Sequence, residues 1–298
     1  MGEILRTPDE RFAHLPGFDF APHYIEDLTG FEDLRLHYLD EGPHDADRVF
    51  LCLHGEPTWS YLYRKMIPVF ASAGQRVVAM DFFGFGRSDK PADESFYTFF
   101  SHREVIRLFI ERLELRAITL VCQDWGGVLG LTLPMDMPGR FDRFLIMNTI
   151  LGTGDAILGE GFLNWRAWSN DHPDMDVAKL LGRTCKHLTA DECAAYAAPF
   201  PDVRYKAGVR RFPNLIPDRP EFPGAELSRC VRAWLNSQWQ GQTFIAVGMK
   251  DPVLGPAIMD ELRKTIRNCP PLYEVPEGGH FLPEWGDEVA HQALKAFG

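Results

Sequence analysis

The chain has 298 residues, more than one ordinary domain needs but suited to an α/β fold with an insertion. Its 45% hydrophobic and 24% charged residues indicate a globular protein, and a net charge of −11 excludes a basic stripe for nucleic acid or anionic membranes. We find neither a secretory signal nor a run of about 18 apolar residues that predicts a membrane span. We therefore expect a cytoplasmic protein with no nucleic-acid or membrane partner.

Strand and helix signals alternate in the first half of the chain, and the continuous apolar run at 49–53 is typical of a strand buried on both faces. We predict strands at 34–39, 49–53, 77–80, 118–121 and 144–147, and helices at 61–73, 99–113 and 128–133. The alternation resumes near the C-terminus, with helices at 226–239, 256–266 and 287–297 and strands at 243–247 and 273–275. This order predicts an α/β protein with a mostly parallel, doubly wound sheet.

Between these two halves the strand signals stop and prolines cluster. We interpret this segment as a helical cap that closes one end of the sheet without joining it. The predicted division is a first core part at 1–149, a cap at 150–225 and a second core part at 226–298.

The stretch 119–127, TLVCQDWGG, predicts a strand, a sharp turn and a helix. Small residues beside the apex suit so tight a turn, and the spacing is that of the nucleophile elbow of α/β-hydrolases. The apex is Asp124, where serine is usual. A carboxylate is already an anion and attacks carbon directly, leaving an ester on the enzyme. The alternative is that Asp124 merely caps the following helix.

Two further polar residues follow later predicted strands, Asp251 and His280. Nucleophile, acid and histidine in that chain order is the α/β-hydrolase order. His280 would be the general base that activates water against the ester, and Asp251 the triad acid that holds the imidazole. The alternatives are a polar loop histidine at His280 and an ordinary turn at Asp251.

Backbone N–H groups are expected to stabilise the oxyanion that forms during ester hydrolysis, and we assign them to Trp125 and Glu56. His54 is expected to shape its loop by hydrogen bonds. No pair of histidines has metal-ligand spacing on one predicted helix, and no phosphate-binding glycine loop is present, so we predict neither metal nor cofactor. The six scattered cysteines are expected to be reduced, buried thiols.

Seven motifs together resemble the haloalkane dehalogenases, in particular the subfamily whose triad acid follows the strand after the cap. They are HGEPTWSY at 54–61, DFFGFG at 81–86, VCQDWGG at 121–127, YAAPFP at 196–201, GVRRFP at 208–213, GMKD at 248–251 and GGHF at 278–281. The resemblance covers nearly the whole chain. It implies an α/β-hydrolase fold with an inserted helical cap.

The resemblance also implies a leaving-group site, in which two tryptophan indole N–H groups hold the departing halide. Trp125 matches the first, and Trp165 matches the second better than Trp168, with simple cap packing as its alternative. By position, five residues would line the substrate pocket, with core packing as the competing role: Phe162, Pro213, Val128, Val253 and Leu254. The segment before Trp165 looks shorter than in the best-known member of the subfamily, which leaves the substrate range open.

The predicted reaction is hydrolysis of a small haloalkane to a primary alcohol, halide and a proton, with water as the sole cosubstrate. An epoxide hydrolase is the nearest alternative, because Tyr196 and Tyr205 lie in the predicted cap. A fluoroacetate-type dehalogenase is less favoured, since no arginine follows Asp124 directly. A non-catalytic ligand-binding homologue is the alternative of another class. We expect a monomer whose partners are a halogenated small molecule and halide.

Overall fold

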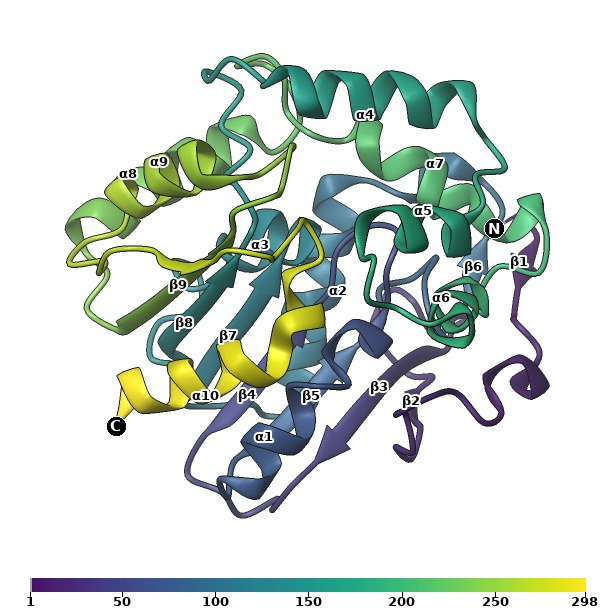
Figure 1. The fold of residues 1–298 in the computed structure, drawn as a ribbon, viewed down its shortest axis with the longest axis horizontal. Coiled ribbons are helices and arrows are strands. Elements are labelled where there is room, and N and C mark those ends of the chain that lie inside the picture. Colours follow the sequence, from purple (N-terminus) through teal and green to yellow (C-terminus); the bar gives the residue numbers. More distant parts are fainter. Residues whose placement is uncertain (1) are drawn as a thin grey trace.

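The computed structural model describes residues 2–298 and is built around an eight-stranded sheet (Figure 1). The strand order is β10-β9-β8-β7-β4-β5-β3-β2. The strands are β2 (His23–Ile25), β3 (Leu36–Glu41), β4 (Val49–Leu53), β5 (Arg76–Met80), β7 (Ile118–Gln123), β8 (Phe141–Met147), β9 (Gln242–Gly248) and β10 (Tyr273–Val275). The strands from β10 to β5 run parallel, whereas β3 and β2 continue the sheet antiparallel. The predicted fold class is confirmed.

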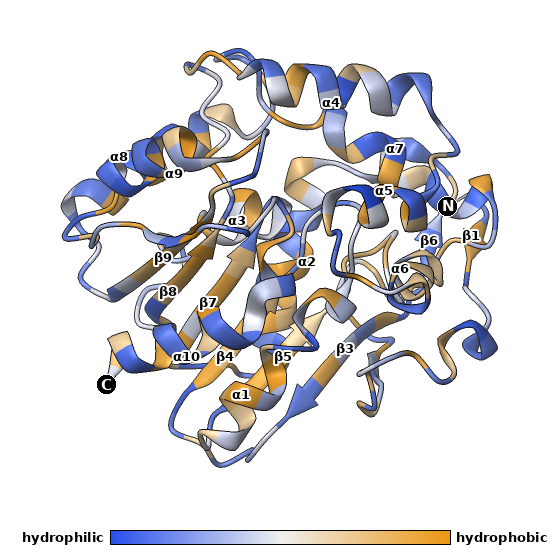
Figure 2. Ribbon diagram, in the orientation of Figure 1, coloured by the Kyte–Doolittle hydropathy of each residue, from blue (hydrophilic) through white to orange (hydrophobic). Residues whose placement is uncertain are grey.

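The central strands are buried along their whole length, as their continuous apolar sequences require. Every residue of β4 and β7 is buried, and Figure 2 shows these strands in the orange of hydrophobic residues. Six helices accompany the sheet: α1 (Ile67–Ser72), α2 (Phe99–Arg112), α3 (Trp125–Gly130), α8 (Ala225–Ser237), α9 (Pro256–Thr265) and α10 (Gly286–Phe297). Helix α1 packs on α10, α2 on α3, and α8 on α9.

The segment between β8 and α8 contains helices and no strand, and the structure describes all of its residues. Its helices are α4 (Glu160–Asp171), α5 (Val177–Thr184), α6 (Ala190–Ala197) and α7 (Ala207–Arg211). In Figure 1, α4 lies above the ends of the strands. This arrangement supports our proposal that residues 150–225 form a cap on a core made of 1–149 and 226–298.

A buried ionic cluster ties this helical segment to the core. Arg64 donates to both carboxylate oxygens of Glu284, over 2.6 and 3.0 Å, and to Glu192 of α6 over 2.9 Å. Tyr196, also of α6, donates to Glu284, and Lys65 lies 3.0 Å from the same carboxylate. Burial alone would raise the pKa of Glu284, but contacts with His187, Arg64 and Lys65 lower it to about 2. The Glu284 carboxylate is therefore charged and fully paired.

Several predicted details were wrong. Instead of one helix at 61–73, a 3-10 helix spans Ser60–Tyr63 and α1 begins only at Ile67, where Pro68 suits a first turn but not a helix interior. Helix α3 ends at Gly130 and tight turns follow it, rather than a helix that reaches 133. The chain also has a two-stranded sheet, β1 (Ile4–Leu5) with β6 (Lys90–Pro91), which is too short to leave a periodic signal.

The cysteines also differ in part from expectation. All six thiols are free, but Cys230 in α8 is exposed and Cys269 is half-buried. Among the histidines, His37 lies in β3 fully buried, with its ring 2.7 Å from Asp81. Within residues 2–298, no helix has the length and hydropathy of a membrane span.

Candidate active site

Asp124 forms the apex of the turn between β7 and α3. Its φ of 49° lies in the left-handed region, which a non-glycine residue adopts only when the surrounding structure requires it. Gly126 permits the turn, because a Cβ there would overlap the carbonyl oxygen of Leu53 on β4. The Asp124 side chain makes no capping hydrogen bond to α3. The helix-cap alternative is therefore wrong, and the carboxylate is free for another role.

The two oxygens of the Asp124 carboxylate have different surroundings. Oδ1 accepts a hydrogen bond from the backbone N–H of Glu56 over 2.9 Å. Oδ2 lies 3.6 Å from Nε2 of His280, beyond hydrogen-bond distance. Among residues 2–298, Glu56 supplies the one backbone N–H bonded to this carboxylate, and the amide of Trp125 makes no such bond. A role for the Trp125 amide as a second donor stays a prediction.

His280 and Asp251 meet as the sequence predicts, although 28 residues separate them in the chain. Nδ1 of His280 lies 2.9 Å from Oδ2 of Asp251, which is buried. Burial raises the pKa of Asp251, but His280 and backbone N–H groups including that of Val253 outweigh it, so the pKa is lowered. For His280 burial lowers the pKa, and the neighbouring Asp251 and Asp124 carboxylates raise it to about 10.

Asn148 directly follows β8 and was not predicted as a site residue. Its Nδ2 donates to Oδ2 of Asp251 over 2.8 Å and to the carbonyl of Leu254 over 3.1 Å, while its Oδ1 accepts from the N–H of Gly248 over 3.0 Å. It thereby holds Asp251, the predicted triad acid, on its loop. A polar residue at the end of an apolar strand was the available signal.

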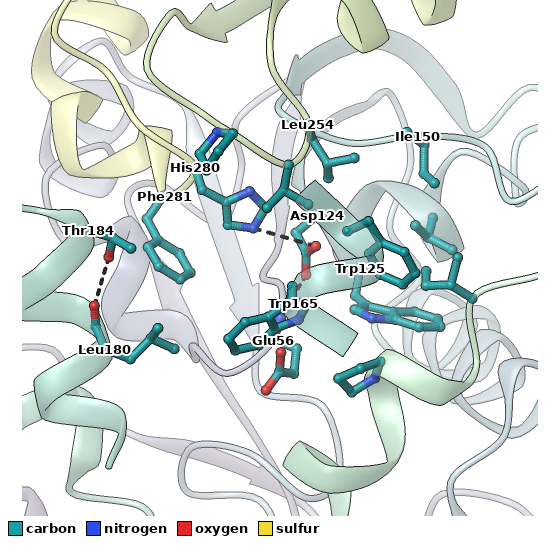
Figure 3. A pocket seen from close by; sticks show the side chains of 16 residues that line it. Glu56, Asp124, Trp125, Ile150, Trp165, Leu180, Thr184, Leu254, His280 and Phe281 are labelled. Carbon is teal, nitrogen blue, oxygen red and sulfur yellow. Dashed lines mark hydrogen bonds and ion pairs between the residues drawn. The ribbon is translucent and has the colours of Figure 1, made fainter. Parts of the chain in front are cut away.

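Asp124 lies on the wall of a cavity of about 100 Å³, whose lining side chains are drawn in Figure 3. All five residues predicted for the pocket lie on its wall: Phe162, Pro213, Val128, Val253 and Leu254. Sequence reasoning missed six others: Ile150, Leu180, Thr184, Ile216, Pro252 and Phe281. The wall is mostly apolar, so it suits an apolar substrate.

Trp125 and Trp165 also line the cavity, and Figure 3 shows both indoles beside Asp124. Within residues 2–298, neither indole N–H donates to a protein acceptor, whereas those of Trp59 and Trp239 do. Trp168 stacks on Trp165 with ring centroids 5.5 Å apart but does not line the cavity. Two unpaired donors therefore face the space in front of the carboxylate.

The Glu56 side chain lies on the same wall, 4% exposed, and its Oε1 has no partner within residues 2–298. Burial is the main cause that raises the pKa of Glu56 well above its ordinary value, and the negative charge of Asp124 raises it further. The protonated, neutral form of the Glu56 side chain is thus favoured. In this form it does not repel the Asp124 carboxylate, as a second charged carboxylate would.

His54 has the loop-shaping contacts expected of it. Its Nδ1 lies 2.9 Å from the carbonyl of Gly55, and its Nε2 accepts from the N–H of Phe82 over 3.0 Å. The two cap tyrosines are absent from the cavity wall: Tyr196 donates to Glu284 instead, and Tyr205 lies elsewhere in the cap. In the described part of the chain no cluster of three or more His, Cys, Asp or Glu residues could hold a metal ion.

The fold and the elbow define the class of this protein, an α/β-hydrolase with a carboxylate at the nucleophile position. The family model described as "alpha/beta hydrolase fold" matches residues 48–287. A haloalkane dehalogenase from Psychrobacter cryohalolentis is 46% identical over 97% of this chain and 96% of its own, and one from Mycobacterium marinum is 38% identical over 98% and 99%. The chain belongs to the haloalkane dehalogenases.

Solved structures agree with this assignment. Haloalkane dehalogenase DpaA from Paraglaciecola agarilytica NO2, described as tetrameric, superposes with a TM-score of 0.97 at 49% identity over 99% of both chains. DbeA from Bradyrhizobium elkani has a TM-score of 0.78 at 25% identity and covers 93% of this chain and 99% of its own. The predicted family and activity are confirmed, and the epoxide hydrolase and non-catalytic alternatives are not favoured.

Proposed function

We propose that this dehalogenase hydrolyses small haloalkanes through an alkyl ester on Asp124, with His280 as general base and Asp251 as triad acid. The observation that carries the proposal is the position of Asp124 at a mostly apolar cavity of about 100 Å³, which is also lined by Trp125 and Trp165, whose indole N–H groups have no acceptor within residues 2–298. A cavity of this volume favours short-chain substrates.

In the first step, Asp124 attacks the carbon that bears the halogen. Oδ2 is the attacking oxygen, because Oδ1 is held by the N–H of Glu56. A C–O bond forms as the C–halogen bond breaks, and the halide leaves with the bonding electron pair. The indole N–H groups of Trp125 and Trp165 receive the anion. A neutral donor on an indole stabilises the halide without an acceptor lone pair to repel it.

In the second step, His280 removes a proton from a water molecule, which attacks Cγ of the ester. Negative charge develops on Oδ1, the oxygen that already accepts from Glu56, so this donor needs no rearrangement. Collapse of the intermediate breaks the Cγ–O bond to the alkyl group, and the imidazolium of His280 returns its proton to the leaving alkoxide to give the alcohol. The Asp124 carboxyl group then releases the second proton of the water to solvent. Asp251 stabilises the imidazolium that forms on His280.

Residues on the cavity wall argue against the nearest alternatives. The epoxide hydrolase alternative depends on cap tyrosines that activate the ring oxygen, and neither Tyr196 nor Tyr205 lines the cavity. A carboxylate substrate such as fluoroacetate would need a cation, and among the described residues no arginine or lysine lines the cavity.

The test is incubation of the purified protein with 1,2-dibromoethane, 1-bromobutane and styrene oxide, followed by halide and proton release. We expect halide from both bromoalkanes, and none from Asp124→Ala. In His280→Phe we expect the alkyl ester to persist, so that intact-mass spectrometry records the added alkyl mass. Turnover of the epoxide alone would refute the proposed reaction, and an unmodified His280→Phe protein would refute the role of His280.

The oligomeric state and the location in the cell stay predictions from the sequence. A monomer is the expectation from the sequence, while the tetrameric description of DpaA gives the competing one. Light scattering after size-exclusion chromatography distinguishes the two. A cytoplasmic location is proposed from the sequence composition, and cell fractionation tests it.

A further inference from the structure

Gln123 contacts the proposed base in two places. It is the last residue of β7, directly before Asp124, and its side chain is fully buried. Its Nε2 donates to the backbone carbonyl of His280 over 3.0 Å and lies 3.3 Å from the ring Nε2 of the same histidine. The two-step reaction above assigns no role to this amide.

The orientation of the amide follows from its neighbours. If the side-chain amide were flipped, Oε1 of Gln123 would face the carbonyl oxygen of His280, and two acceptors would meet. In the observed orientation Oε1 is buried and has no partner in the described part of the chain. A buried oxygen without a hydrogen-bond partner is unfavourable. The contact of the Gln123 Nε2 with His280 is therefore kept at a cost to the stability of the folded protein.

The amide and the carboxylates act on His280 in opposite directions. Because Nδ1 donates to Asp251, a neutral ring carries its lone pair on Nε2, where it accepts from the amide of Gln123. An imidazolium would point its Nε2–H at the same donor. Asp251 and Asp124 favour the imidazolium, whereas Gln123 favours the neutral ring.

Other charged groups surround His280, and a change at Gln123 leaves them in place. Glu56 faces it across the cavity, and the groove on its other side contains Arg183, Lys186, His187, Lys250 and Glu277. These groups affect the pKa of the His280 ring equally in wild type and in a Gln123 variant. A comparison of the two proteins therefore measures the effect of the Gln123 amide alone.

We propose that Gln123 is a positioning residue that holds the His280 ring over the alkyl ester and favours its neutral, base-competent form. The proposal rests on the proposed function, because only ester hydrolysis requires a neutral base. The 3.3 Å contact is long for a hydrogen bond, so an incoming water displaces the amide from Nε2 while the 3.0 Å bond to the carbonyl keeps the loop in position.

Two substitutions at Gln123 separate the effect of its N–H donor from the effect of its side-chain shape. Gln123→Met has a similar length but no N–H, and Gln123→Glu has the same shape with an acceptor in place of the donor. Gln240→Met, at an exposed glutamine before β9, is the matched control. Rapid-quench experiments with 1,2-dibromoethane measure the bromide burst and the decay of the alkyl-protein separately, across pH. Melting temperatures identify any variant that is merely destabilised.

We expect Gln123→Met to keep a bromide burst within about twofold of wild type, because alkylation needs no base. Decay of the alkyl-protein at pH 7 should slow about tenfold, the change that one pKa unit produces. The acidic limb of its pH profile should move to higher pH, further in Gln123→Glu. Because the covalent intermediate accumulates, KM should fall together with kcat. Gln240→Met should match wild type.

If Gln123→Met reduced the bromide burst and the decay rate of the alkyl-protein equally, and left the pH profile unshifted, Gln123 would have a purely structural role. That result would overturn the proposal. Absence of any bromide release by wild type would instead overturn the proposed function. An NMR titration of the His280 ring in the resting protein remains decisive in that case. There Gln123→Met should raise the pKa of His280, and an unchanged pKa would overturn the proposal without reference to activity.

Discussion

Replacement of Trp165 by phenylalanine tests the leaving-group site most directly. The side chain keeps an aromatic ring in the cavity wall but loses the indole N–H, which has no protein acceptor within residues 2–298. Trp125 remains as the other donor on the wall. The variant therefore removes one of the two hydrogen bonds proposed for the halide.

The expected magnitude follows from the chemistry of that bond. A hydrogen bond to a charged group contributes about 1.5–3 kcal/mol, and each 1.4 kcal/mol is about tenfold in affinity. The cavity wall is apolar, so water does not replace the lost donor readily. We expect the bromide Kd to rise roughly tenfold to a hundredfold, and alkylation to slow because the same bond stabilises the departing halide.

A bromide titration followed by tryptophan fluorescence measures this change, since Trp125 still reports on the cavity. Trp168→Phe is the matched control: it lies on the same helix α4 and stacks on Trp165, but does not line the cavity. An unchanged bromide Kd in Trp165→Phe, or an equal rise in Trp168→Phe, would refute the assignment of Trp165 and favour simple cap packing.

The remaining predictions concern two buried charge clusters. Glu284→Gln leaves Arg64 without its main partner, and removal of one partner from a buried pair costs about 3–5 kcal/mol, so denaturant unfolding should show a large loss. Glu277→Gln, an exposed pair with Lys250, should cost under about 1 kcal/mol, and equal losses would refute the buried cluster as a stabilising contact. Since the pKa of Glu284 falls from 4.5 to about 2 on folding, its contribution is present above pH 4.5 and lost as the pH falls toward 2, and Glu284→Gln should remove that part of the acid sensitivity. Asp124→Asn removes one of the carboxylates that raise the pKa of His280 to about 10, so an NMR titration should give a lower pKa, and an unchanged value would contradict the coupling.

Much of the fold and of the candidate site could be predicted from the sequence, because the signals are local. Continuous apolar runs marked the strands at β4 and β7, and the spacing around Asp124 marked the elbow. The chain order of Asp124, Asp251 and His280 was informative because the carboxyl ends of parallel strands meet at one edge of a sheet. The sequence predicted helix α1 but not its start, since Pro68 sets that start and the preceding 3-10 turn is too short to be periodic.

Only the tertiary structure decided which groups touch. Asn148 meets Asp251 across 103 residues of sequence, and Gln123 meets His280 across 157, and no periodic pattern encodes such contacts. The inequivalence of the two Asp124 oxygens depends on the position of one N–H, that of Glu56, which only the packing of the loop determines. The sequence by itself thus determined the fold and the family, and it predicted the nucleophile and the triad. The size of the cavity, the indole donors that have no acceptor within residues 2–298, and the polar groups that contact His280 and Asp251 are products of long-range packing.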